Sequence, residues 1–136
     1  MEGGESNLTK AQALNKFFSS FSLLALEENS VPGGDNAPSF PYATYSLVLD
    51  SIGGEIPLTF NLWYRDKQLY SSLPDIIGKT EEISKRIGRG GITIPCDGGF
   101  IWLKRGTPFA QIMGDPEDEL IKRAYINITA EYLTAD

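Results

Sequence analysis

The chain is expected to fold as an α+β domain, with a mostly antiparallel β-sheet and two α-helices packed on one face of it. Apolar residues recur with the period of a helix in two stretches, residues 10–20 and 72–87. Apolar and polar residues alternate in residues 56–65 and 124–132, as they do in half-buried strands. Asp97-Gly98-Gly99 separates two further strand-like segments. The predicted order is helix, three strands, helix, four strands.

The first helix is predicted from about Lys10 to Ser20. Thr9 and Gln12 have the spacing of a capping box, in which each side chain binds a free backbone N–H of the helix start. Residues 1–8 are polar and rich in glycine, and we expect a flexible tail there, followed by a single domain over residues 9–134. The apolar face of the helix consists of Ala13, Leu14, Phe17, Phe18 and Phe21.

A short edge strand is predicted at Leu23–Glu28, followed by a loop from Asn29 to Phe40 that is rich in proline and glycine. This loop of about ten residues is long for a small domain, and long loops are often functional. Tyr42–Asp50 and Ile56–Arg65 are predicted as two strands joined by a tight glycine hairpin at Ser51–Glu55.

The second helix is predicted to start near Ser71 or Ser72 and to end before Gly88, where a helix favours a residue with positive φ. Its expected apolar stripe consists of Leu73, Ile76, Ile77, Ile83 and Ile87.

The remaining chain is predicted to be all β. Ile92–Cys96 and Phe100–Lys104 form a hairpin, in which Pro95 indicates an edge strand or a strand end. Phe109–Met113 is expected as a short separate strand, and Gly114–Glu119 as the turn before the last strand.

Composition limits the class of protein. With 41% hydrophobic and 22% charged residues among 136, the chain resembles an ordinary soluble domain. The net charge of -6 argues against sequence-independent nucleic-acid binding, which needs a basic surface. No apolar run approaches the roughly 20 residues of a membrane span, and the N-terminus lacks the pattern of a signal peptide.

The sequence offers no catalytic constellation and predicts no metal ion or cofactor. It contains no histidine, which removes the commonest general base and metal ligand. Cys96 has no neighbour that would activate it and is interpreted as structural. The acidic cluster Asp115–Glu119 matches no known cation loop and is interpreted as a solvated turn, with cation binding as the alternative.

The two tryptophans are open to more than one interpretation. Trp63 falls on the less apolar side of its strand and is equally compatible with the core and with an interface. For Trp102 a place in the core is favoured.

Several long segments resemble one family. They are Asn15–Phe18, Ala25–Pro32, Phe40–Tyr45, Asn61–Arg65, Gly91–Gly106 and Tyr125–Tyr132. They look like the corresponding parts of small phage "minor capsid" proteins, encoded in the head-tail connection region of long-tailed phages and prophages of Gram-positive bacteria. The similarity extends over about residues 14–133 and includes no catalytic motif.

The resemblance implies a tail terminator, also called a tail-completion or tail-to-head joining protein. Such a protein forms a hexameric ring on the tail tube, stops tube growth and docks to the head connector. The implied partners are further copies of itself, the major tail tube protein and a head-completion or connector protein. DNA would pass through the ring without sequence-specific binding, and the protein would be assembled in the host cytoplasm and reside in the virion.

We expect the loop at residues 29–40 and the hairpin at residues 92–104 to contact neighbouring subunits or the tube. The candidate interface residues are Val31, Pro32, Asp35, Phe40, Trp63, Arg65, Asp97, Phe100, Trp102, Asp115 and Glu117. Two alternatives remain: a monomeric protein-binding module or another connector component, and a hydrolase or metal-dependent enzyme built on carboxylates alone. A melting temperature that does not respond to Mg²⁺, Mn²⁺ or Ca²⁺ would argue against the enzyme.

Overall fold

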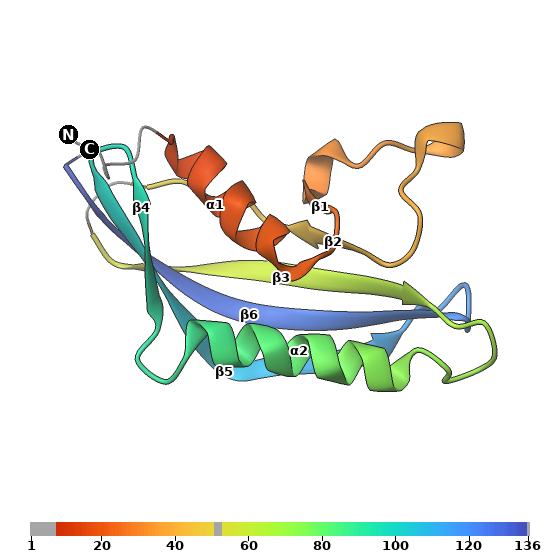
Figure 1. Ribbon diagram of the computed structural model, residues 1–136. Coiled ribbons are helices and arrows are strands. Elements are labelled where there is room, and N and C mark those ends of the chain that lie inside the picture. The colour runs from red at the N-terminus through yellow and green to blue at the C-terminus, as the bar shows by residue number, and fades with distance from the viewer. Residues whose placement is uncertain (1–7, 51–52, 136) are drawn as a thin grey trace.

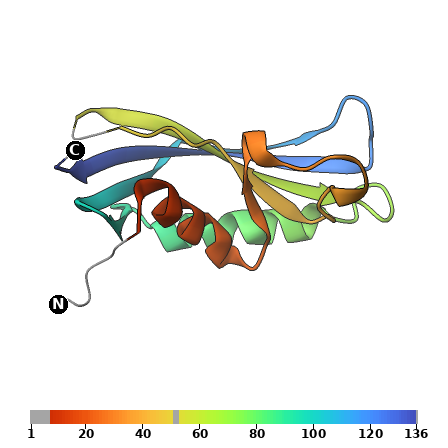
Figure 2. The same ribbon diagram turned by 90° about the horizontal axis from the view of Figure 1, so that it is seen from above.

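The structure is a computed structural model that describes residues 8–50 and 53–135. A six-stranded sheet of order β1-β2-β3-β6-β5-β4 carries both α-helices on one face (Figures 1 and 2). The elements in chain order are α1 (Lys10–Phe18), β1 (Ala25–Glu27), β2 (Tyr42–Tyr45), β3 (Glu55–Arg65), α2 (Leu73–Ile87), β4 (Ile92–Cys96), β5 (Gly99–Gly114) and β6 (Ile121–Thr134).

The predicted α+β class is therefore confirmed, with one difference in the sheet. The short strand β1 runs parallel to β2, so the sheet is mixed, while the other neighbouring strands are antiparallel. Three short 3-10 helices, Ser19–Phe21, Glu28–Ser30 and Gly34–Asn36, complete the described elements.

The helix α1 begins as predicted. The Thr9 hydroxyl accepts a hydrogen bond from Gln12 N at 3.1 Å, and the Gln12 side chain accepts one from Thr9 N at 3.0 Å. The helix then buries its phenylalanines against β3, where the rings of Phe18 and Phe60 lie 4.5 Å apart. Leu8, the last residue of the predicted tail, packs on the core, and its carbonyl accepts a bond from Asp97 N, so the domain includes it. Residues 1–7 lie outside the described residues.

The predicted strand at residues 42–50 is shorter than expected, because β2 ends at Tyr45. The following segment turns toward other partners: the Val48 carbonyl accepts a hydrogen bond from Tyr132 Oη, and the Asp50 carbonyl accepts one from Lys10 Nζ, both at 2.5 Å. The last pair of β2 with β3 is Tyr45 with Phe60, so the connection between these strands is longer than the predicted tight hairpin at residues 51–55. Its residues 51 and 52 lie outside the described residues.

The helix α2 starts after Ser72 and ends at Gly88, which has the positive φ expected, 78°. Ile76, Ile83 and Ile87 are buried as predicted. Leu73 and Ile77 are not, with exposed fractions of 37% and 42%, because they lie on the flank of the helix and not on the side that meets the sheet.

The predicted strand at Phe109–Met113 is part of β5, so three strands follow α2 and not four. A shift of register between Arg105 and Ala110 lets one long strand pair with β6 on both sides of the irregularity. Asn127 on β6 donates to the Pro108 carbonyl at 2.9 Å and holds the irregular part against the sheet.

Candidate interaction surface

The side of the sheet that faces away from α1 and α2 is the open face. Figure 2 shows both α-helices beneath the sheet and no α-helix of the described residues on the opposite side. The alternation of each strand sends one set of side chains into the core and the other set to this face. Its members include Tyr42, Thr44, Asn61, Trp63, Arg65, Trp102, Lys104, Arg123, Tyr125 and Glu131.

Five side chains at one end of the open face form a continuous series, here called the aromatic row: Phe40, Tyr42, Trp63, Arg123 and Tyr125. The ring centroids of Phe40 and Tyr42 lie 5.3 Å apart, and Tyr42 stacks on Trp63 at 6.3 Å with 17° between the rings. The guanidinium of Arg123 lies 5.2 Å from the centroid of Trp63 and 5.5 Å from that of Tyr125.

Polar contacts fix the positions of Trp63 and Arg123 in the aromatic row, although the members of the row are only half-buried. Trp63 Nε1 donates to Thr44 Oγ1 at 2.9 Å, and Arg123 Nη2 approaches the Met113 sulfur at 2.9 Å. Burial raises the pKa of the Tyr42 phenol. Ordered aromatic and arginine side chains at a partly exposed position are typical of the residues that dominate protein interfaces.

Asn61 lies beside the aromatic row, between Thr44 and Tyr125 in the register of the sheet. Its side chain is buried at 5% exposure, and its Oδ1 has no hydrogen-bond partner among the described residues. A buried acceptor without a partner costs about 1–3 kcal/mol, so this position is destabilising in the isolated chain.

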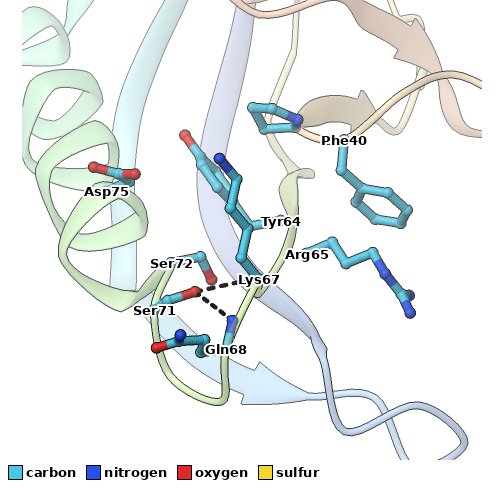
Figure 3. A pocket seen from close by; sticks show the side chains of 9 residues that line it. Phe40, Tyr64, Arg65, Lys67, Gln68, Ser71, Ser72 and Asp75 are labelled. Carbon is cyan, nitrogen blue, oxygen red and sulfur yellow. Dashed lines mark hydrogen bonds between the residues drawn. The ribbon is translucent and has the colours of Figure 1, made fainter.

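A hollow of about 510 Å³ adjoins the aromatic row at Phe40 (Figure 3). Phe40 and Arg65 lie on one side of it, and Asp75 at the start of α2 lies on the other. The Ser71 hydroxyl accepts hydrogen bonds from the backbone N–H of Lys67 at 2.9 Å and of Gln68 at 3.2 Å. The hollow is open to solvent and is lined by polar as well as apolar side chains, so it suits an extended peptide better than a small, purely apolar molecule.

The carboxylate of Asp66, next to this hollow, is almost completely buried at 2% exposure. Burial alone would raise its pKa, but hydrogen bonds from the Ser72 hydroxyl, from the N–H groups of Ser72 and Tyr70, and from Lys122 outweigh burial and hold the pKa well below its usual range. Asp66 therefore stays ionised and fixes the turn that starts α2.

The predicted interface residues fall into three groups, of which the first and the third meet where Arg65 contacts Asp118. Phe40 and Trp63 belong to the aromatic row, whereas Val31, Pro32 and Asp35 lie in the protruding loop before it, Pro32 and Asp35 being exposed. Arg65 lies at the end of β3, and its Nη1 is 2.6 Å from an Asp118 oxygen.

The second group lies at the opposite end of the open face. Phe100 is 51% exposed and pairs with Leu133, and Asp97 is exposed in the β4–β5 turn. The interpretation of Trp102 as a core residue is wrong: its ring lies half-buried on the open face, with Lys104 Nζ 4.2 Å above it, because the core side of β5 is taken by Ile101 and Leu103.

The third group is the turn between β5 and β6. Asp115 accepts a hydrogen bond from Glu117 N at 2.8 Å, and Asp118 accepts one from Leu120 N at 3.0 Å. Both side chains thereby stabilise the turn. Within residues 8–50 and 53–135, no three acidic or cysteine side chains gather in a way that could hold a metal ion.

Cys96 is buried, and burial is the main cause that raises the pKa of its thiol. A thiol in this state is a weak nucleophile at neutral pH. None of the helices in the described part of the chain combines the length and the apolar character needed to cross a bilayer.

Sequence reasoning missed Tyr42, Asn61, Arg123 and Tyr125 as parts of one surface, and missed Asp66 as a buried carboxylate. The alternation in β6 assigned Tyr125 to the outer side, but only the register of β3 with β6 places Arg123 opposite Trp63. In comparisons with known proteins, no family model, no curated protein and no solved structure matches the chain.

Proposed function

We propose that the protein is a structural component of the head-tail junction of a long-tailed phage, a tail terminator that forms a ring on the tail tube and docks to the head connector. The proposal rests on the resemblance of the segments between residues 14 and 133 to phage minor capsid proteins. The observation in the structure that supports it best is the aromatic row on the open face, a half-exposed series of stacked side chains suited to contact with another protein.

A ring of identical subunits needs contacts in which two different surfaces of each copy meet and close the circle. The open face is one such surface, and the loop at residues 31–39, which precedes the aromatic row, is a second. Because Pro32, Gly33, Gly34 and Asp35 are exposed, this loop can reach a neighbouring subunit. A net charge of -6 would keep DNA from adhering to the channel of the ring.

Negative-stain electron microscopy of the protein, alone and mixed with tail tubes of its phage, tests the proposal. Hexameric rings, or tubes capped at one end, are expected. The variant Trp63→Ala should abolish capping while the protein stays folded, whereas Tyr70→Ala, which removes an exposed ring outside the open face, should not. A wild-type protein that neither forms rings nor binds tubes would overturn the proposal.

The second candidate is a monomeric protein-binding module, or another connector component, without enzymatic activity. The hollow beside Phe40 favours it, because that hollow and the aromatic row together could hold one extended peptide (Figure 3). Electron microscopy with tail tubes separates the two candidates, since the module would form no ring of six on the end of a tube.

A further inference from the structure

We propose that two copies of this chain pair through the free edge of β5 at residues 109–114, around a two-fold axis. The strand β4 accompanies β5 only as far as Leu103, whereas β5 continues to Gly114 with β6 on its other side. In the described part of the chain no strand lies along the outer edge of residues 109–114 (Figure 1). The outer edge of residues 109–114 is here called the free edge.

The two terminal strands of the sheet are protected from pairing, in contrast to the free edge. At the β4 edge, Cys96 pairs with Gly99 across a two-residue turn, so the backbone nitrogen of the neighbouring Pro95 points outward, away from β5. An added strand would need an N–H donor at this position, and proline has none. The strand β1 has only three residues, and Asn15 Nδ2 approaches its Ala25 carbonyl at 3.5 Å. Phe109–Gly114 contains neither a charge nor a proline, the two usual devices against edge pairing.

An exposed apolar strip lies beside the free edge. Arg105 on β5 donates to the Ser84 hydroxyl at 3.0 Å, so the flank of α2 that carries Ser84 faces β5. Ile77 and Leu73 lie about two and about three turns before Ser84, on the same flank of the helix. Ile112, opposite Ala124 on the helix-covered side of the sheet, is 36% exposed. The strip of Leu73, Ile77 and Ile112 is therefore available to a strand that pairs with β5.

The charges around the free edge fit a second copy of the same chain. At one end of the edge, Arg89 and Arg105 line a hollow of about 360 Å³ and form no ion pair with the described residues. At the other end lies the acidic turn, whose Glu117 and Glu119 are exposed and also form no ion pair there. Antiparallel pairing centred on Ile112 places the basic end of each copy, with Arg89 and Arg105, beside the acidic turn of the other copy.

A two-fold axis perpendicular to the sheet keeps both α2 helices on the same face. The apolar strips of the two copies then meet at the paired Ile112 side chains, and the two sheets join into one continuous sheet. The contact is isologous and uses none of the aromatic row, so the free protein can pair in this way before any ring forms on the tube.

Disulfide formation tests the geometry. In a Cys96→Ser background, Ile112→Cys places the two thiols across the axis, where opposed Cα atoms about 4.5–5.5 Å apart fall within the range that a disulfide spans. We expect an oxidised dimer with Ile112→Cys and none with Thr93→Cys, an exposed position on the protected β4 edge. Equal cross-linking of the two variants would overturn the proposal.

Sedimentation tests the contact without a cross-link. The wild type should be a dimer at about 100 µM, and Ile112→Lys should be a monomer that still unfolds cooperatively, at the temperature of the wild type measured at concentrations where the wild type is monomeric. Arg105→Glu and Glu119→Arg should each weaken the dimer about tenfold, and the double variant should restore it. A monomeric wild type, or an oligomer indifferent to Ile112→Lys, would contradict the pairing.

Discussion

The Lys122 ammonium lies 3.1 Å from a carboxylate oxygen of the buried Asp66 and thereby fastens the turn before α2 to β6. The same carboxylate accepts a hydrogen bond from Tyr70 N at 2.9 Å and two from Ser72. Tyr70 adopts a positive φ of 70° here, a conformation that a tyrosine rarely takes and that the carboxylate helps to hold. One side chain thus sets the path of the chain from β3 into α2, beside the hollow of Figure 3.

Asp66→Asn should lower the free energy of unfolding at pH 7 by about 2–3 kcal/mol, because the hydrogen bonds lose their charged acceptor. Urea denaturation would measure the loss. The exposed helix variant Glu81→Gln serves as the control and should leave the midpoint nearly unchanged. A loss no larger than that of the control would contradict the structural role assigned to Asp66.

The same carboxylate predicts how stability depends on pH. The pKa of Asp66 is lowered by folding, so its contribution is fully present above the unfolded value of about 3.9 and is lost as the pH falls toward the folded value. Unfolding curves of the wild type between neutral and strongly acidic pH should therefore fall more steeply than those of Asp66→Asn. Parallel curves for the two proteins would show that Asp66 does not titrate as proposed.

Two glycine-to-alanine changes should act in opposite directions. Gly91 has a φ of 84°, and a Cβ there would lie 2.6 Å from the Leu103 carbonyl oxygen, so Gly91→Ala should destabilise the fold by about 1–3 kcal/mol. Gly78 lies inside α2, and a Cβ added there would meet no atom within 4 Å beyond the backbone of its own helix. Gly78→Ala should therefore stabilise the fold by about 0.5–1 kcal/mol. Thermal unfolding of both variants, compared with the wild type, checks the two signs.

Substitution of Asn61 should change the stability of the domain and its binding to tail tubes in opposite directions. Asn61→Val removes the buried Oδ1 that lacks a partner among the described residues and should raise the free energy of unfolding by about 1 kcal/mol. If the open face binds another protein, the same variant should bind tail tubes more weakly, because the partner loses its hydrogen bond. A variant that is both less stable and fully active in capping would refute this interpretation of Asn61.

Deleting residues 33–37 should prevent assembly and leave the domain folded. These residues are exposed, and none belongs to the core, so the loss of packing is small. Circular dichroism would establish that the shortened protein folds, and electron microscopy with tail tubes would test its assembly. Tubes capped as efficiently as by the wild type would remove the loop from the proposed interface.

Local patterns in the sequence determined much of the fold. The capping box at Thr9 and Gln12 and the period of Phe17, Phe18 and Phe21 define α1, because both depend only on residues within a few turns of each other. The glycine turn between β4 and β5 and the alternation of β6 are local in the same way. These are the elements that the sequence predicted correctly.

Tertiary contacts decided what those patterns could not. The strand β2 ends at Tyr45 because Tyr132 and Lys10, distant in the chain, bind the carbonyls of Val48 and Asp50. Trp102 lies on the open face because its neighbours Ile101 and Leu103 fill the core, and Arg123 meets Trp63 only through the register of β3 with β6. Alternation divides a strand into two sides, but only the packing of the helices decides which side is covered, and only strand pairing brings distant side chains into one surface.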